Sequence, residues 1–234
     1  MRRSNLYCRG LTINIQRSTV NSQQLTANSQ PPVGVAGNGA ELDADALLQA
    51  SRRLDWRFLL PDPELGHVAC LGAVAAELQD SMRLFSESLT VLALEEKQNG
   101  EMGQFDVVVL RHLSSEKLEL AAEWLKPGGY LYAENDGYLS GGKHWRFAVP
   151  SACVTAVSQA GFTEVQAHWH WPNFAACTRI IPLDDRDALR FSFVRGGRSA
   201  KARLQSGFGR LLLWSGLLKQ VVPRFSIIAQ LDSL

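Results

Sequence analysis

The chain has 234 residues, of which 46% are apolar and 20% charged, and its formal net charge is +1. These fractions are ordinary for a soluble globular protein, and the length suits one α/β domain of roughly 190 residues plus a tail. The net charge argues neither for nor against nucleic acid as an overall partner. No apolar run reaches the length of about 18 residues that a membrane-spanning helix needs.

The four cysteines lie far apart and form no CxxC pair: Cys8, Cys70, Cys153 and Cys177. This spacing indicates neither a structural zinc site nor a disulfide framework, so no metal is expected. The N-terminus also lacks the long apolar region of a secretion signal. We therefore expect a cytoplasmic protein, because a reducing cytosol is the simplest location for such a chain.

Residues 1–40 are rich in Ser, Asn, Gln, Gly and Thr and contain few apolar side chains. This composition predicts a disordered tail, with a weak strand at 11–15 as the alternative. A folded domain is expected over 41–234. It opens with a helix, because apolar residues recur along one face at Leu42, Ala46, Leu47 and Ala50.

A buried strand and a glycine turn are predicted at His67–Gly72, where Gly72 is the one glycine of the stretch LGAVAAEL. A helix over 75–84 and a strand over 89–94 follow. Glu95 comes directly after that strand, and only about ten residues separate it from Phe105.

Residues 105–134 contain a complete strand, helix and strand. The run Val107–Leu110 suits a strand that is buried on both faces. Ser114 or Ser115 can cap the helix that follows, and Lys126-Pro127-Gly128-Gly129 ends it and turns the chain into the next strand. The three elements predict a βαβ crossover in a parallel sheet.

The segments FDVVVL and LKPGGYLYAE of this unit resemble the fourth strand, following helix and fifth strand of class I S-adenosylmethionine-dependent methyltransferases. The resemblance implies an α/β fold with a Rossmann-like, mostly parallel twisted sheet and helices on both faces. It also implies that Gly72 lies in the cofactor loop and that Glu95 binds the ribose hydroxyls. Asp106, which leads the apolar run, is a further cofactor-binding candidate.

Two departures from this family pattern stand out. The acidic residue and the second and third glycines of the usual motif are missing around Gly72, so an ordinary βα turn is the alternative. The short link after Glu95 leaves no room for a further helix and the third strand. Either one βα unit is deleted, or the strand over 89–94 takes the place of the third strand. In both cases the sheet is shortened in its second and third strand region.

Polar residues follow both strands of the central unit, where open α/β sheets collect ligand-binding groups. His112 is a candidate base, because imidazole titrates near neutrality; it could equally cap the helix or face solvent. Glu134, Asn135 and Asp136 end the second strand. We take Asp136 as a second catalytic candidate and Asn135 as a substrate-binding one.

A helix over 150–160 precedes Glu164–Trp171, an alternating segment that resembles the sixth strand of the family. His168 and His170 lie on one side of this strand, about 7 Å apart. They are candidates for substrate binding, with a metal site and a half-exposed strand face as alternatives.

Residues 172–224 form an insertion before the closing strand. It carries eight basic residues and no acidic one between Arg190 and Arg224, together with a dense apolar run at 204–222. This combination suits a membrane interface or an anionic lipid-linked substrate. The alternative is a helix packed on the sheet. A nucleic-acid partner is disfavoured, because the aliphatic surface is too continuous.

The resemblance implies an S-adenosylmethionine-dependent methyltransferase, for which we expect a small or lipid-linked acceptor. The alternative is a methyltransferase-like protein without catalysis that binds a protein partner in a biosynthetic assembly. The expected location is the cytoplasm, with peripheral contact at the inner membrane surface as an option.

Overall fold

The computed structural model describes residues 43–92, 103–136, 149–194, 211–216, 218, 222 and 224–233. The predicted tail, Glu95 and most of the basic part of the insertion lie outside the described residues. None of the described helices is long and apolar enough to cross a membrane.

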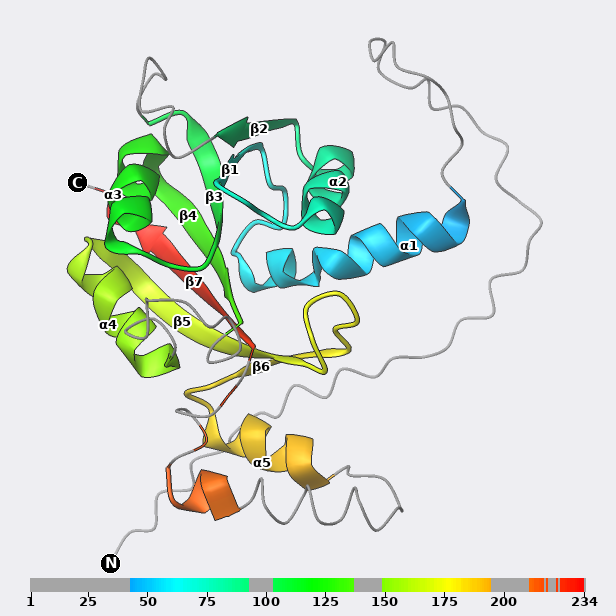
Figure 1. The fold of residues 1–234 in the computed structure, drawn as a ribbon, viewed down its shortest axis with the longest axis vertical. Helices are drawn as coiled ribbons and strands as arrows, with labels where there is room; N and C mark the ends of the chain where they lie inside the picture. The colour runs from blue at the N-terminus through cyan, green and yellow to red at the C-terminus, as the bar shows by residue number, and fades with distance from the viewer. Residues whose placement is uncertain are drawn as a thin grey trace, which may run out of the picture. The chain divides into compact units, whose positions relative to one another are not determined.

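The described chain is built on one seven-stranded sheet with the order β2-β1-β3-β4-β7-β5-β6 (Figure 1). Strands β1 to β5 run parallel to one another, and β6 and β7 run antiparallel to their neighbours. The strands are β1 (His67–Leu71), β2 (Ser88–Leu92), β3 (Phe105–Arg111), β4 (Leu125–Asn135), β5 (Phe162–Trp171), β6 (Arg179–Pro182) and β7 (Phe225–Leu231).

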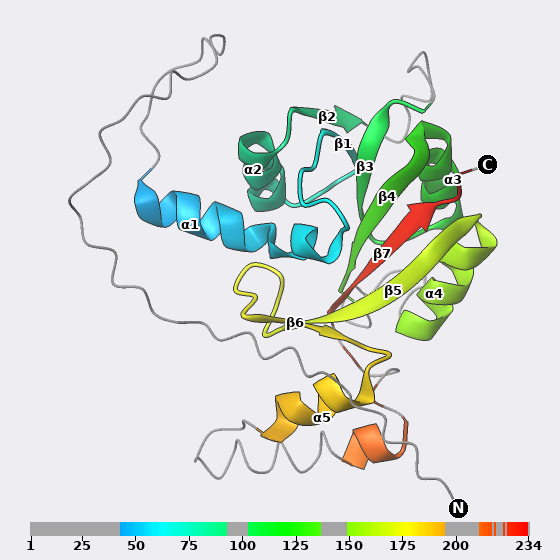
Figure 2. The same cartoon turned by 180° about the vertical axis from the view of Figure 1, so that it is seen from behind.

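Helices cover both faces of this sheet (Figures 1 and 2). Alternate residues of the strands point to opposite faces, so the core has two parts. Val107 and Val109 pack with Trp56 and Met82 on one face, and Val108 and Leu110 belong to the other. The first face carries α1 (Ala44–Arg53), η1 (Asp55–Leu59) and α2 (Ala76–Phe85); the second carries α3 (Ser115–Trp124) and α4 (Pro150–Gln159).

The predicted central unit is present as β3, α3 and β4. The Ser114 side chain caps α3 by accepting a hydrogen bond from the Lys117 main-chain N at 3.3 Å. The helix ends at Trp124, earlier than predicted, and the proline-glycine segment already lies within β4. A register shift between β3 and β4 accommodates it. A Cβ at Gly129 would lie 2.9 Å from the Lys126 carbonyl oxygen, so glycine is needed there.

The two edge strands of the described sheet correspond to the two places where the sequence departs from the family pattern. Within the described residues, β2 is the last strand on its side, which agrees with the predicted shortening. On the opposite side, the insertion contributes β6, which pairs with β5, and then α5 (Arg186–Val194). The α/β fold class predicted from the sequence is confirmed.

Candidate functional site

The carboxyl ends of the parallel strands meet at one end of the sheet, which we call the carboxyl end. Leu71 of β1 pairs with Leu110 of β3, and Asn135 of β4 pairs with Phe225, the first residue of β7. Because β7 is antiparallel, its start lies where the other strands finish. Ligands of open α/β folds bind outside this end of the sheet.

Gly72 lies directly after β1 at the carboxyl end. Its φ of 74° is in the left-handed region, which glycine adopts without a steric penalty. Its main-chain N donates a hydrogen bond to the Leu92 carbonyl oxygen at 2.9 Å, which ties the turn to the end of β2. The predicted partner in cofactor binding, Glu95, lies outside the described residues.

The backbone of His112 is held in an unusual conformation directly after β3. Its φ is 59°, and the left-handed region costs a non-glycine residue about 1–2 kcal/mol. Three hydrogen bonds stabilise this conformation. The His112 N donates to the Glu134 carbonyl oxygen at 2.9 Å, and Lys117 Nζ donates to the carbonyl oxygens of Arg111 and His112 at 2.6 and 2.9 Å.

The His112 ring is half-buried and hydrogen-bonds with the Asn135 side chain. Burial, and then the positive charge of Arg111, hold its pKa below the ordinary histidine value. Asn135 is itself buried and donates to Cys153 Sγ at 3.5 Å. Burial raises the pKa of Cys153 to about 12, so the thiol stays protonated. The arrangement provides a neutral, oriented imidazole that can accept a proton.

Asp136 follows β4 and lies between two arginines. Its Oδ2 accepts a hydrogen bond from Arg111 Nη2 at 3.1 Å, and its Oδ1 lies 3.9 Å from Arg224 Nε. Neither arginine was predicted from the sequence as a site residue. The available signal for Arg111 was its position directly after the buried run Val107–Leu110. Arg224 could be placed here only once β7 was known to start at the carboxyl end.

A buried ion pair joins α1 to the end of β4. Arg53 Nη1 and Nη2 donate to Glu134 Oε1 and Oε2 at 2.6 and 2.8 Å, and the Tyr132 hydroxyl donates to Oε1 at 2.9 Å. Trp56 stacks on Tyr132 with ring centroids 3.8 Å apart. Burial alone would lower the pKa of Arg53, but Glu134 outweighs it and the pKa is raised. Glu134 ends β4 beside the candidate site, but its carboxylate is occupied by Arg53.

His168 and His170 are each only 2% exposed, so the alternative of a half-exposed strand face is wrong. His170 Nε2 hydrogen-bonds with Ser226 Oγ at 2.9 Å, and Phe174 covers its ring. Burial lowers the pKa of His168 to about 4 and that of His170 to about 3, so both rings are neutral. No group of three or more His, Cys, Asp or Glu residues within the described chain could hold a metal.

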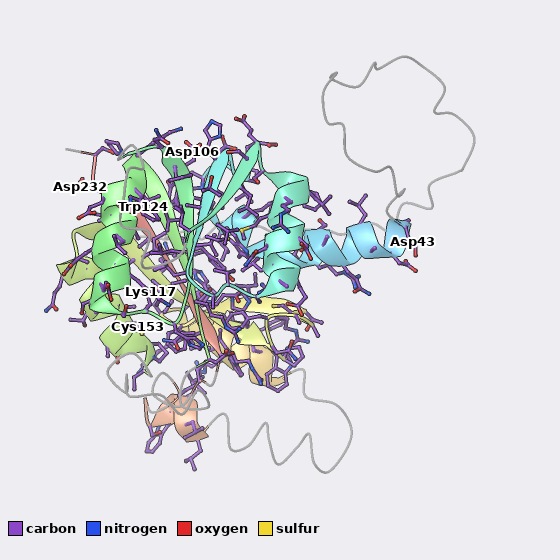
Figure 3. All side chains as sticks on the ribbon, turned by 45° about the horizontal axis from the view of Figure 1, so that its top comes forward. Asp43, Asp106, Lys117, Trp124, Cys153 and Asp232 are labelled. Carbon is purple, nitrogen blue, oxygen red and sulfur yellow. The ribbon has the colours of Figure 1, made fainter. Side chains whose placement is uncertain are left out.

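Asp106 lies at the other end of the sheet from Gly72. Its carboxylate accepts hydrogen bonds from the His67 main-chain N and from Lys126 Nζ, both at 2.8 Å. Burial raises the pKa of Asp106, but these two hydrogen bonds outweigh it and the net pKa is lowered. Asp106 and Lys117 lie at opposite ends of the sheet (Figure 3). Asp106 therefore joins β3 to its neighbours and is not part of the candidate site.

The deciding observation for the fold is the position of β7. It is the last strand of the chain, and it lies antiparallel between β4 and β5 of an otherwise mostly parallel sheet. The described chain therefore has the Rossmann-like, mostly parallel sheet that the resemblance to class I methyltransferases implies. A scan against models of protein families finds no match, and a search of curated proteins finds none.

Several solved methyltransferase structures are similar to this chain, at low sequence identity. Phosphoethanolamine N-methyltransferase 2 of Haemonchus contortus is 12% identical with a TM-score of 0.42, and the match covers 81% of this chain and 53% of that one. A methyltransferase from Archaeoglobus fulgidus is 15% identical with a TM-score of 0.44, covering 79% and 93%. One from Thermotoga maritima is 12% identical with a TM-score of 0.42, covering 78% and 88%. The chain thus spans about half the length of the Haemonchus protein.

The structure brings several of the predicted site residues to the carboxyl end of the sheet. Gly72, His112, Asn135 and Asp136 all follow or end strands there. His168 and His170 lie near the end of β5 but are buried beneath other side chains. The site therefore consists of a glycine turn, an oriented imidazole and a carboxylate that two arginines contact.

Proposed function

We propose that the protein binds S-adenosylmethionine and transfers its methyl group to a small or lipid-linked acceptor. One observation carries this proposal. A glycine turn with positive φ and an oriented, neutral imidazole stand on neighbouring strands, β1 and β3, at the carboxyl end of a methyltransferase-type sheet. This is where such sheets bind their ligands.

The residues of the site fit the requirements of methyl transfer. Gly72 has no side chain to keep a cofactor away from the backbone, and Glu95 is the proposed partner of the ribose hydroxyls. The bound cofactor would supply an electrophilic methyl group. The protein then has to align the acceptor and remove its proton, for which His112 is the proposed base and Asn135 and Asp136 line the approach.

Calorimetric titration with S-adenosylmethionine and S-adenosylhomocysteine tests cofactor binding. We expect binding by the parent protein and a loss of roughly tenfold or more in affinity in Glu95→Ala, because a charge-assisted hydrogen bond is removed. Glu87→Ala is the matched control, since Glu87 is an exposed carboxylate whose nearest ion-pair partner is His67 at the opposite end of the sheet. Absence of binding at millimolar ligand would rule out the enzyme.

A non-catalytic binding role is the second candidate. The observation in its favour is the Arg53–Glu134 pair, which occupies one of the carboxylates at the end of β4 and fixes α1 against the sheet. The incomplete glycine motif around Gly72, which lacks the second and third glycines, also favours a role without catalysis. A folded protein that binds neither cofactor nor its demethylated product in the titration would favour this role, with another protein as partner.

Contact with a membrane surface is a separate proposal, independent of methyl transfer. Helix α5 and the helical segment at 211–214 expose Phe191, Leu211 and Trp214, with 58%, 58% and 84% of each residue accessible. The neighbouring Leu212 and Leu213 pack against the core, so the segment has one buried and one exposed apolar side. Exposed aromatic side chains beside basic sequence suit a lipid interface. Vesicle flotation measures this contact.

A further inference from the structure

The end of β4 is flanked by an arginine on each side. Arg111 is the last residue of β3, and Arg224 directly precedes β7. Since β3 and β7 are the two neighbours of β4, the two guanidinium groups approach Asp136 from opposite sides. One contact is a hydrogen bond of 3.1 Å and the other an ion pair at 3.9 Å.

Among the described residues, these guanidinium groups have hydrogen-bond donors without an acceptor. Each carries five N–H groups, and within the same residues Asp136 accepts a hydrogen bond from Arg111 only. In the part of the chain that the structure describes, the Arg224 side chain makes no hydrogen bond. The two arginine side chains are 40% and 37% exposed, so a ligand can reach them.

Positive charge is in excess around Asp136. Arg111, Arg224 and Lys117 are the described cations here, and the adjacent Glu134 is neutralised by Arg53. Lys117 donates to main-chain carbonyl oxygens and forms no ion pair with a carboxylate in the part of the chain that the structure describes. A site with this balance attracts anions and repels a cationic acceptor.

We propose that Arg111 and Arg224 form a subsite for an anionic group on the acceptor, a phosphate or a carboxylate. A planar guanidinium matches such oxyanions in a bidentate geometry. The anionic group would displace the weak contact between Arg224 and Asp136 and lie beside His112. The assignment of this anionic group to the acceptor rests on the proposed methyl transfer. The existence of an anion subsite does not depend on that proposal.

Calorimetric titration without S-adenosylmethionine tests the subsite, with glycerol 3-phosphate as the soluble probe and phosphatidylglycerol vesicles as the lipid probe. We expect Arg224→Gln and Arg111→Lys each to weaken binding by roughly tenfold, because a charge-assisted contact is lost. Asp136→Asn should strengthen binding several-fold, since the competing carboxylate is removed. Arg83→Gln, an exposed arginine of α2 that pairs with Asp80, should leave binding unchanged.

The two probes distinguish the source of the anion. Binding of glycerol 3-phosphate that depends on Arg224 supports a soluble acceptor, and binding of the vesicles alone with the same dependence supports a lipid-linked one. The proposal is overturned if neither probe binds, if both variants of the subsite arginines bind like the parent, or if Arg83→Gln loses as much affinity. Anion binding by a protein that fails to bind S-adenosylmethionine would overturn the proposed enzyme and leave the subsite standing.

Discussion

At the scale of single residues, Lys117 fixes the backbone conformation of His112 at the carboxyl end of the sheet. Its ammonium group bonds two consecutive carbonyl oxygens and keeps His112 at positive φ. The same ammonium lies close enough to lower the pKa of the imidazole, along with burial and Arg111, while Asp136 and the hydrogen bond with Asn135 raise it. Lys117 is therefore a positioning residue for the proposed base.

Replacing Lys117 with methionine should raise the pKa of His112, because a nearby positive charge that disfavours the imidazolium is removed. Titration of the His112 ring signals by NMR measures this shift directly. Lys126→Met serves as the control, since Lys126 pairs with Asp106 at the other end of the sheet. An unchanged His112 titration in Lys117→Met would contradict the assignment.

At the scale of the elements, the Arg53–Glu134 pair joins α1 to β4 across 81 residues of sequence. Both side chains are buried, and Tyr132 and Trp56 surround the pair. A pair of this kind contributes little net stability compared with well-packed apolar residues, but losing one partner leaves the other charge buried and uncompensated. The position of α1 on the sheet should thus be sensitive to single replacements.

Arg53→Met alone should lower the free energy of unfolding by about 3–5 kcal/mol, and Arg53→Met with Glu134→Leu should recover much of that loss. Urea unfolding monitored by circular dichroism measures both values. In the exposed Arg83–Asp80 pair, Arg83→Met should cost less than about 1 kcal/mol. A double variant as unstable as the single one would contradict this account.

At the scale of the whole molecule, the apolar surface of α5 and residues 211–214 predicts binding to anionic membranes. Trp214→Glu should reduce flotation with phosphatidylglycerol vesicles severalfold, because an exposed aromatic side chain is replaced by a charge that anionic lipid repels. Phe58→Glu is the matched control, since Phe58 is 62% exposed on η1. Equal flotation of the two variants, or none by the parent, would count against this surface.

The sequence by itself determined the local units of the fold. The Val107–Leu110 run and the serines at 114 and 115 predicted β3 and the start of α3, and both elements are present. The end of α3 was predicted too late, because the proline-glycine segment lies within β4. Gly72, His112, Asn135 and Asp136 were predictable as site candidates for a related reason. Residues that directly follow buried parallel strands must lie at the carboxyl end of the sheet.

Only the tertiary structure decided which side chains are buried there and which partners they have. The burial of His168 and His170 depends on what covers β5, including Phe174 and Arg53. The pairing of Arg53 with Glu134 joins segments that are far apart in the chain, so no local sequence pattern predicts it. Asp106 was misjudged even though it precedes the run Val107–Leu110, which places it at the opposite end of the sheet from residues that follow the run. Long-range contacts, which short sequence patterns do not encode, determined these details.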